Sequence, residues 1–249
     1  MILETGHPVR HFDRIDSTNQ EARRVAEQGE CGPLWLWADE QTGGRGRLGR
    51  NWVSEPGNLY ATFLFSIAEG PQAAAQVSFV AALAVHETAI YFRPELSPRI
   101  KWPNDVLIGA AKFCGVLPEV VASAPTRIAI GCGVNVAHAP EGTPYPVTAL
   151  GPGIPVEAVL RELDRNLAVR LKQWDGGRGF ALIRDHWAAR ALGLGGQVTA
   201  SAGTSERTGT FKGLAADGAL ILEAADGELH SIHAGEVKFA ELEALRRKP

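Results

Sequence analysis

The apolar and polar residues alternate in ways that predict both strands and helices in the first 190 residues. LWLWADEQ (34–41) is rich in strand formers, and NLYATFLFSI (58–67) is apolar on both faces, as in a central strand. From Val77 to Phe92 and from Val156 to Trp174, apolar residues recur at helical spacing instead. We expect these two helices to cover a sheet, with a further helix around 180–187 closing the domain.

Shorter segments complete this pattern. HFDRIDSTNQEARRVAEQG (11–29) predicts a strand followed by a helix, because Ser17 and Thr18 each precede a Gln or Glu by three residues, as in a capping box. Gly29 should end that helix. Three strand-like pieces are expected next, around 100–101, in FCGVLPEVV and in RIAIGCGVNV.

The sequence changes character after the GLGG segment, 193–196. Short strand-like runs follow, and the pairs Asp217-Gly218 and Asp226-Gly227 are strong hairpin signals. We therefore predict two domains, residues 1–194 and a small β-barrel at 195–249, appended to a domain that mixes strands and helices.

Composition restricts the function classes. Of 249 residues, 45% are hydrophobic and 21% are charged, and the net charge of −3 argues against a general nucleic-acid coat protein. Neither a secretory signal nor an uncharged apolar run of bilayer length is evident, so a cytoplasmic protein is expected. Cys31, Cys114 and Cys132 are odd in number and widely spaced, which disfavours disulfides and zinc and predicts reduced thiols.

One loop concentrates the candidate chemistry. QTGGRGRLGRNW (41–52) holds four glycines and three arginines. Glycine lets backbone approach a ligand, and the guanidinium groups of Arg45, Arg47 and Arg50 can each bind a carboxylate or phosphate with two donors. The spacing fits neither the nucleotide-hydrolase phosphate loop nor the dinucleotide fingerprint. The loop alone leaves open an anion site, a solvated loop and an RNA-binding arginine-glycine segment.

Three later segments add candidates. KWPND (101–105) sets a cation, an aromatic ring, a proline turn and two oxygen-bearing side chains together, which suits phosphate and metal but also an ordinary capped turn. In KFCGVLPE, Lys112 precedes Gly115 by three residues and could equally be surface charge. GCGVNV places glycines and Asn135 in a strand pattern that disfavours them, and such violations mark functional sites.

Four segments that follow one another along the chain, before a hairpin-rich tail, together resemble the biotin protein ligases. They are DSTNQEA, GGRGRLGRNW, KWPNDVLIGAAKFCGVLPE and GCGVNV. The resemblance covers nearly the whole chain. It implies an α+β fold, with a class II synthetase-like catalytic domain built on a mixed sheet and a C-terminal SH3-like β-barrel. It also implies biotin and ATP as substrates, Mg²⁺ as cofactor, and a biotinyl-5'-AMP intermediate that modifies a lysine of biotin carboxyl carrier protein with release of pyrophosphate.

The resemblance also implies roles for individual residues. Lys112 and Arg47 would be catalytic, Lys112 by bridging the carboxylate and the α-phosphate, and Asp105 would contact the metal. The implied biotin-binding residues are Ser17, Thr18, Asn19, Gln41, Gly44, Arg45, Gly46, Arg47, Lys112, Gly115 and Gly133. The implied ATP-binding residues are Arg45, Arg47, Trp52, Lys101, Asn104, Lys112 and Asn135, with Trp52 near the adenine.

Two departures from the family pattern matter. Leu48 stands where many members carry a third basic residue, which lowers the charge of the loop slightly. Bifunctional members have a winged helix-turn-helix before the ligase domain, whereas only fifteen residues precede Asp16 here, so we expect no DNA binding and no operon repression.

Rival functions remain at this stage. A lipoate or octanoate ligase of the same superfamily would share the sheet and Lys112, but those relatives lack GRGR and KWPND as written here. An RNA-binding module is disfavoured by the net charge and by the lack of aromatic residues interleaved with basic ones. His230 and His233 are expected at the surface. Sheet edges can pair two copies, so a homodimer stays open beside a monomer, and no membrane partner is expected.

Overall fold

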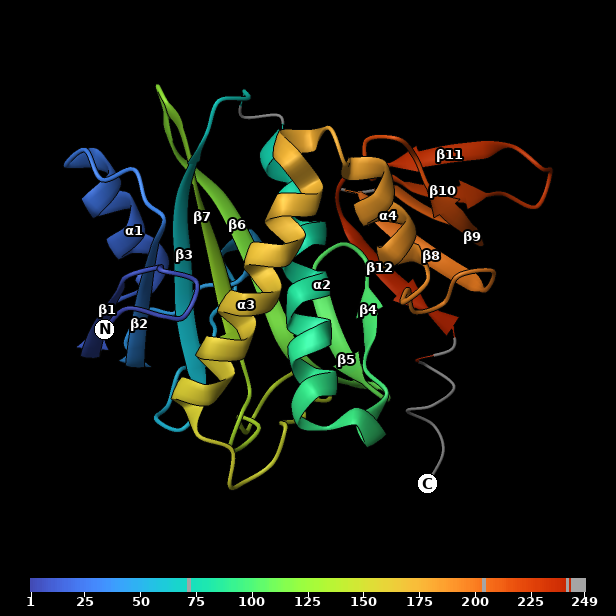
Figure 1. The fold of residues 1–249 in the computed structure, drawn as a ribbon. Helices are drawn as coiled ribbons and strands as arrows, with labels where there is room; N and C mark the ends of the chain where they lie inside the picture. Colours follow the sequence, from blue (N-terminus) through green and yellow to red (C-terminus); the bar gives the residue numbers. More distant parts are fainter. Residues whose placement is uncertain (71–72, 203–204, 241, 243–249) are drawn as a thin grey trace.

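A computed structural model describes residues 1–70, 73–202, 205–240 and 242 (Figure 1). A seven-stranded sheet forms its larger part, in the order β1-β2-β3-β7-β6-β5-β4. Only β1 and β2 pair in parallel; every other neighbouring pair is antiparallel, so the sheet is mixed as predicted. The strands are β1 Val9–Ile15, β2 Leu34–Gln41, β3 Leu59–Ile67, β4 Arg99–Lys101, β5 Asp105–Ile108, β6 Ala111–Ser123 and β7 Thr126–Val134.

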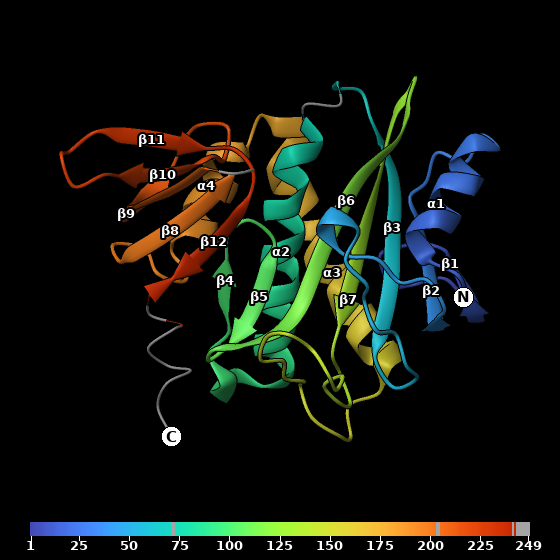
Figure 2. The ribbon, with the colours of Figure 1, turned by 180° about the vertical axis from the view of Figure 1, so that it is seen from behind.

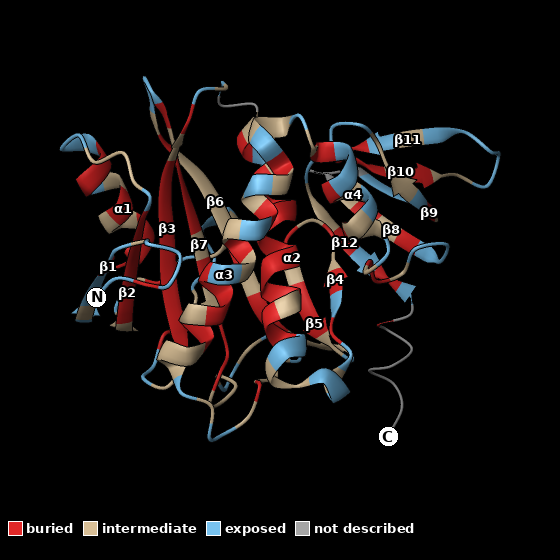
Figure 3. Cartoon of the chain, in the orientation of Figure 1, coloured by how far each residue is buried: buried red, intermediate tan, exposed pale blue. Residues whose placement is uncertain are grey.

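Helices cover both faces of this sheet. They are α1 Thr18–Glu27, α2 Ala74–Phe92, α3 Val156–Trp174 and α4 Phe180–Ala188, with short 3-10 turns at Arg47–Gly49, Pro94–Leu96 and Asp175–Gly177. α2 and α3 lie on one face over the main core, and α1 packs on the other against a smaller apolar cluster (Figure 3). The predicted helices at 77–92, 156–174 and 180–187 are therefore confirmed.

α2 is long and apolar enough to cross a membrane by length and composition alone. However, 67% of its most apolar window is buried inside the protein, against the sheet, α3 and α4. This burial explains the high apolar content of α2 as that of a core helix.

The chain continues into a second, antiparallel sheet in the order β11-β10-β9-β8-β12. Its strands are β8 Gln197–Ala202, β9 Ser205–Leu214, β10 Leu220–Glu223, β11 Leu229–Ile232 and β12 Glu236–Phe239. Within the described residues, the outer strands β11 and β12 do not pair with each other, so the strands form an open sheet rather than the closed barrel expected. The predicted domain also reaches 243–249, which lies outside the described residues, and its boundary at 194/195 stays a prediction.

Both predicted hairpins of the second sheet are present. β9 and β10 pair across Asp217-Gly218, and β10 and β11 pair across Asp226-Gly227. The amide of Gly218 donates to Ala215 O at 3.0 Å, and Gly218 has a φ of +91°. Glycine is favoured where the backbone turns back with a positive φ, which is why the sequence signal was reliable.

The two sheets share an apolar seam. Trp102, buried after β4, donates its indole N–H to Gly218 O at 3.1 Å. A Cβ added at Gly218 would lie 2.9 Å from Phe79 of α2, and one added at Gly193 would lie 2.3 Å from Phe239 of β12. Buried residues of both sheets belong to one continuous core.

Two local predictions were wrong. Ser17 is the N-cap of α1, but its side chain makes no capping hydrogen bond, so the capping boxes do not form. The sequence also predicted three strands between α2 and α3, whereas a fourth, β5, pairs with β4 through Lys101↔Asp105. β5 has four residues, too few for a visible alternation.

Candidate active site

Three glycines on β6 and β7 leave the α1 face of the large sheet without side chains over a small area, which forms the floor of a pocket. Gly115 on β6 pairs with Gly133 on β7, and Gly131 lies two residues before Gly133. A Cβ at Gly131 would lie 2.3 Å from Asn19 Oδ1, and one at Gly133 would lie 2.5 Å from the indole of Trp52. These positions therefore need glycine, and the missing side chains leave a depression on the sheet.

One end of this pocket is polar and nearly neutral. The amide and hydroxyl of Thr18 donate to Gln41 Oε1 at 2.8 and 3.1 Å, and the buried Thr62 hydroxyl donates to Asn19 Oδ1 at 2.6 Å. Asn19 Nδ2 in turn donates to Glu119 Oε2 at 2.7 Å. Because Ser17 does not cap α1, its hydroxyl is available where it lines the pocket. This network holds donors and acceptors in fixed positions at the start of α1.

The glycine-arginine loop connects β2 to β3 and crosses this face (Figure 2). It folds back on itself, with Gly46 N bonded to Arg50 O at 2.8 Å and Trp52 N bonded to Gly44 O at 3.0 Å. A Cβ at the buried Gly44 would lie 2.4 Å from Trp52 O. Gly44 therefore permits the close approach of the two halves of the loop.

The loop is anchored through its arginines. Arg47 donates to Asn104 Oδ1 and to Gly235 O, both at 3.1 Å, and Arg50 pairs with Glu236 of β12. Partial burial lowers the pKa of Arg47, and Asp105 opposes that shift. Arg47 nevertheless stays cationic at neutral pH, since guanidinium groups do not deprotonate in proteins. Leu48, at the departure from the family pattern, lines the pocket although it is 77% exposed.

Lys112 lies at the opposite end from the polar network. Its Nζ is 2.8 Å from Asp105 Oδ1, 5.2 Å from the ring centroid of Trp52 and 5.6 Å from that of Tyr145. Carboxylate and aromatic faces both stabilise an ammonium group. Lys112 lines the same pocket as Arg45 and Arg47, so an anion there would meet positive charge from several side chains.

Most predicted site residues gather around this one pocket. Those that line it are Ser17, Thr18, Asn19, Gln41, Arg45, Gly46, Arg47, Trp52, Asn104, Asp105, Lys112, Gly115 and Gly133. Their assigned roles remain predictions. Trp52, expected near adenine, rests on Gly115 and Gly133, and Asp105, expected at a metal, pairs with Lys112.

Three predicted residues lie elsewhere. Gly44 is buried within the loop, where a Cβ would meet Trp52 O and the side chains of Ser54 and Gln41. Lys101 lines an adjacent cavity together with Arg47 and Lys112, and its Nζ is 5.9 Å from the ring centroid of Phe239. Asn135 is 1% exposed and contacts backbone instead of the pocket. Neither Gly44 nor Asn135 lines the pocket as this structure describes it, and their contacts with biotin and ATP stay predictions.

Other pocket residues escaped prediction. Gly131, Tyr60, Tyr145 and Glu236 line the pocket. Gly131 was visible in GCGVNV beside Gly133. Tyr60 lies in a strand that was read only as core; burial raises its pKa to about 12, which keeps the phenol neutral. Tyr145 and Glu236 come from a loop and from the second sheet, and no local pattern marks them.

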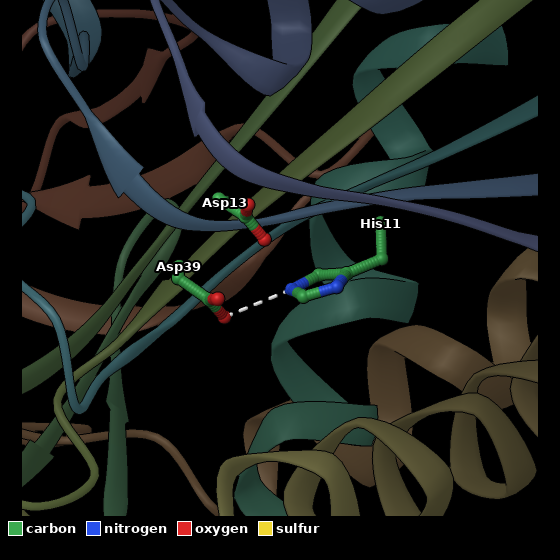
Figure 4. A group of neighbouring side chains, drawn as sticks. All are labelled: His11, Asp13 and Asp39. Atoms are coloured by element: carbon green, nitrogen blue, oxygen red, sulfur yellow. Dashed lines mark hydrogen bonds and ion pairs between the residues drawn. The ribbon is translucent and has the colours of Figure 1, made fainter.

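Titratable clusters elsewhere are separate from the pocket. His11 and Asp13 of β1 and Asp39 of β2 place ligand atoms within 4.8 Å of one another on an exposed strand surface (Figure 4). His11 Nε2 lies 2.9 Å from Asp39 Oδ1, so an ordinary hydrogen bond accounts for that contact. His233 is exposed as predicted, and the half-buried His230 lies against Arg207.

The three cysteines are free, as expected. Burial raises the pKa of Cys114 and brings that of Cys132 to about 12. Both remain protonated thiols at neutral pH and act as small apolar residues of the core.

This geometry, with neutral polar groups at one end and cations at the other, defines an α+β enzyme domain for an elongated ligand with an anionic end. The model of the Biotin/lipoate A/B protein ligase family matches residues 11–135, and that of the Biotin protein ligase C terminal domain matches 193–239. The chain therefore belongs to the biotin protein ligase family.

Individual relatives agree with this assignment. The chain is 41% identical to a Biotin--[acetyl-CoA-carboxylase] ligase of Paracoccus denitrificans, over 91% of this chain and 98% of the relative. A ligase of the same name from Mycobacterium tuberculosis is 30% identical, over 95% and 91%. Among solved structures, a biotin protein ligase from Aquifex aeolicus in complex with biotin and ATP superposes with a TM-score of 0.79 at 29% identity, covering 93% of this chain and 98% of that one.

Proposed function

We propose that this chain is an ATP-dependent biotin protein ligase that joins biotin to a lysine of a biotin carboxyl carrier domain. One observation carries the proposal: a single pocket joins the polar network at Thr18 and Gln41 to the cations Arg47 and Lys112, in a chain of this family. Biotin has a neutral ureido ring at one end and a carboxylate at the other, which matches this polarity.

The first step would join two anions. A biotin carboxylate oxygen attacks the α-phosphorus of ATP, the bond to the β-phosphate oxygen breaks, and pyrophosphate leaves. Cations that neutralise charge on the phosphoryl oxygens supply most of the help in such a step. Lys112 is 2.8 Å from Asp105, so it would exchange this partner for the carboxylate and the α-phosphate. Arg45 and Arg47 would enclose the same oxygens from the loop.

Binding of the ureido ring would use the opposite end of the pocket. The Ser17 hydroxyl, Thr18 and Gln41 provide donors and acceptors, and the network to Thr62 and Asn19 fixes their orientation. Preorganised polar groups favour a ligand that satisfies all of them, since an analogue without those groups leaves buried atoms unpaired. This end should set the preference for biotin.

The second step would consume the adenylate. A lysine amine of the carrier domain attacks the acyl carbon of the mixed anhydride, AMP leaves, and an amide forms. The pocket opens beside Arg47 and Asn104, which also border a cavity between the two sheets. A lysine side chain is long enough to enter the pocket from this side.

Magnesium fits the pocket only together with phosphates. Asp105 and Glu236 are the carboxylates that line it in the described part of the chain, and they pair with Lys112 and Arg50. Mg²⁺ is commonly held by one or two carboxylates plus substrate phosphates. We therefore propose that Asp105 would hold Mg²⁺ when ATP is bound, where the ion would neutralise phosphate charge.

The deciding experiment supplies the purified chain with ATP, Mg²⁺, labelled biotin and a carrier domain, with labelled lipoate in parallel because the family description includes lipoate ligases. Transfer of biotin to the carrier lysine supports the proposal. Lipoylation without biotinylation would overturn it, and the polar end of the pocket argues against that outcome because an acyl chain cannot satisfy it.

We further propose a cytoplasmic enzyme that acts without binding DNA, consistent with its net charge of −3. The second, open sheet is proposed to support the glycine-arginine loop through Gly235 and Glu236. A gel shift with a biotin-operon promoter tests the DNA prediction, and biotin-dependent retardation would contradict it.

A further inference from the structure

The half-buried Glu119 of β6 lies just past the floor of the pocket. Side chains two residues apart on a strand share a face, so Glu119 follows Gly115 and Leu117 on the side of the sheet that carries α1. Gly115 and Leu117 line the pocket, whereas Val121, further along β6, belongs to the apolar cluster beneath α1. A carboxylate therefore stands where the pocket ends and the apolar cluster begins.

The carboxylate of Glu119 is bonded to a neutral amide. Asn19 Nδ2 donates to Glu119 Oε2 at 2.7 Å and to Leu117 O at 3.2 Å. Glu119 takes part in no ion pair among the described residues. A carboxylate and a carbonyl oxygen are acceptors only, so the Asn19 amide must face both of them with its nitrogen.

This orientation of Asn19 decides the direction of the next hydrogen bonds. Its Oδ1 faces the buried hydroxyl of Thr62, which donates to it at 2.6 Å. A hydroxyl has one proton, so Thr62 cannot at the same time donate to Thr18 Oγ1, which is 2.8 Å away. The Thr18 hydroxyl then acts as donor, to Thr62 or to Gln41 Oε1. Lone pairs of Thr18 Oγ1 stay available to a donor on a ligand in the pocket that Thr18 lines.

The opposite orientation of Asn19 would reverse this order. Its nitrogen would donate to Thr62, and the Thr62 proton would turn to Thr18 Oγ1 and occupy a lone pair there. Its oxygen would face the acceptors Glu119 and Leu117 O, which is unfavourable because neither has a proton to give. The bond to the carboxylate is the shorter of the two and is charge-assisted, so Glu119 contributes most to excluding this orientation.

We propose that Glu119 is a positioning residue for the polar end of the pocket. It fixes the Asn19 amide and, through Thr62, keeps Thr18 as an acceptor for a ligand N–H. The inference deepens the proposed ligase function and rests on it, because the ureido ring of biotin carries N–H donors. Glu119 is not among the residues that line the pocket, so it acts through Asn19.

The orientation of Asn19 can be tested without any activity. In isotope-labelled protein followed by NMR, solvent exchange of the Asn19 side-chain amide protons should accelerate about tenfold in Glu119→Leu, because the stronger acceptor is lost. Leu suits a position that borders an apolar cluster. Glu119→Gln can present an oxygen to the same amide, so exchange should stay within about threefold of the wild type. Unchanged exchange at Asn19 in Glu119→Leu would overturn the proposal.

Glu162→Leu is the matched control. Glu162 Oε1 accepts from Asn166 Nδ2 at 3.1 Å on α3, and neither residue lines the pocket. This variant should lower the unfolding temperature and leave exchange at Asn19 unchanged. Acceleration at Asn19 as large as in Glu119→Leu would show a general loosening of the fold and would count against a specific role for Glu119.

The effect on substrate binding is measured by biotin-dependent ATP–pyrophosphate exchange. Glu119→Leu should raise the KM for biotin about tenfold and leave kcat within about twofold, because the cationic end of the pocket is untouched. Glu119→Gln should return KM to within about threefold of the wild type, since it keeps an oxygen acceptor. A Gln variant as weak as the Leu variant would contradict the role of that acceptor. Glu162→Leu should leave the KM unchanged.

Thr62→Val tests the path from Glu119 to Thr18, because it removes the hydroxyl that links Asn19 to Thr18. In this background Glu119→Leu should raise the KM for biotin no further, since residues of one network are not additive. A second increase of the same size would refute the path. If the wild-type chain shows no biotin-dependent exchange of pyrophosphate, the proposed ligase function fails, and the NMR comparison still decides whether Glu119 fixes Asn19.

Discussion

Replacing Arg47 by glycine should loosen the glycine-arginine loop and leave the Arg50–Glu236 ion pair as its remaining side-chain contact described here with the second sheet. The half-buried guanidinium donates to Asn104 Oδ1 and Gly235 O, both at 3.1 Å. Hydrogen bonds of charged groups contribute ~1.5–3 kcal/mol each, and partial solvent screening brings the pair to about 2 kcal/mol in total. That loss corresponds to about a thirtyfold shift from the closed loop toward the open one.

The assay measures how fast the biotinyl-adenylate leaves the enzyme. Adenylate is formed in a single turnover with labelled biotin, and the complex is then diluted into albumin without a carrier domain. Label should appear on albumin about thirtyfold faster with Arg47→Gly than with the wild type. Arg47→Lys keeps the charge but cannot reach both acceptors as a fork, so it should fall between them. An Arg47→Gly enzyme that forms adenylate and retains it as long as the wild type would refute the reasoning.

Three further predictions use other parts of the structure. Lys112→Ala should slow adenylate formation at least ~100-fold. The free energy of unfolding in urea should change by less than ~1 kcal/mol, because the ion pair between Lys112 and Asp105 is partly exposed. Normal pyrophosphate release by this variant would contradict a catalytic role for Lys112. Gly131→Ala should raise the KM for biotin at least ~10-fold, because the added methyl group would displace Asn19. An unchanged KM would show that the pocket does not depend on glycine at position 131. Burial lowers the pKa of His86 to about 4, so the unfolded state binds the proton first and stability falls as pH drops from 6.5 toward 4. Across that range the wild type should lose about 3 kcal/mol more than His86→Leu in urea titrations, and parallel curves would reject this account.

The fold was predictable where a segment carries its own signal. The apolar spacing of α3 gave its bounds, and β3 is buried on both faces as its sequence indicates. The same holds for the glycine-arginine loop, because its high content of glycine and arginine is visible without knowledge of the fold. Gly115 and Gly133 pair across β6 and β7, which is why two separate motifs meet at one floor.

The remaining site features depend on tertiary contacts. Asn135 lies one residue past a strand whose glycines face the pocket, yet its own side chain bonds backbone behind it. Ser17 has the sequence of a capping residue, but Asp16, Gln41 and the pocket decide where the polar groups at α1 point. Tyr145 and Glu236 reach the site from distant positions, and only the packing of the connection after β7 and of β12 brings them there.

The seam between the sheets has a consequence for how the molecule melts. Separation of the two sheets would expose three buried aromatic side chains to solvent, because each packs against a glycine or a backbone atom across the seam. They are Trp102, Phe79 and Phe239. Exposure of this much aromatic surface to water is unfavourable, so we expect that the two sheets do not separate as independent units. The two parts should consequently denature together, as one calorimetric event, and a chain truncated before β8 should precipitate instead of folding as a smaller ligase.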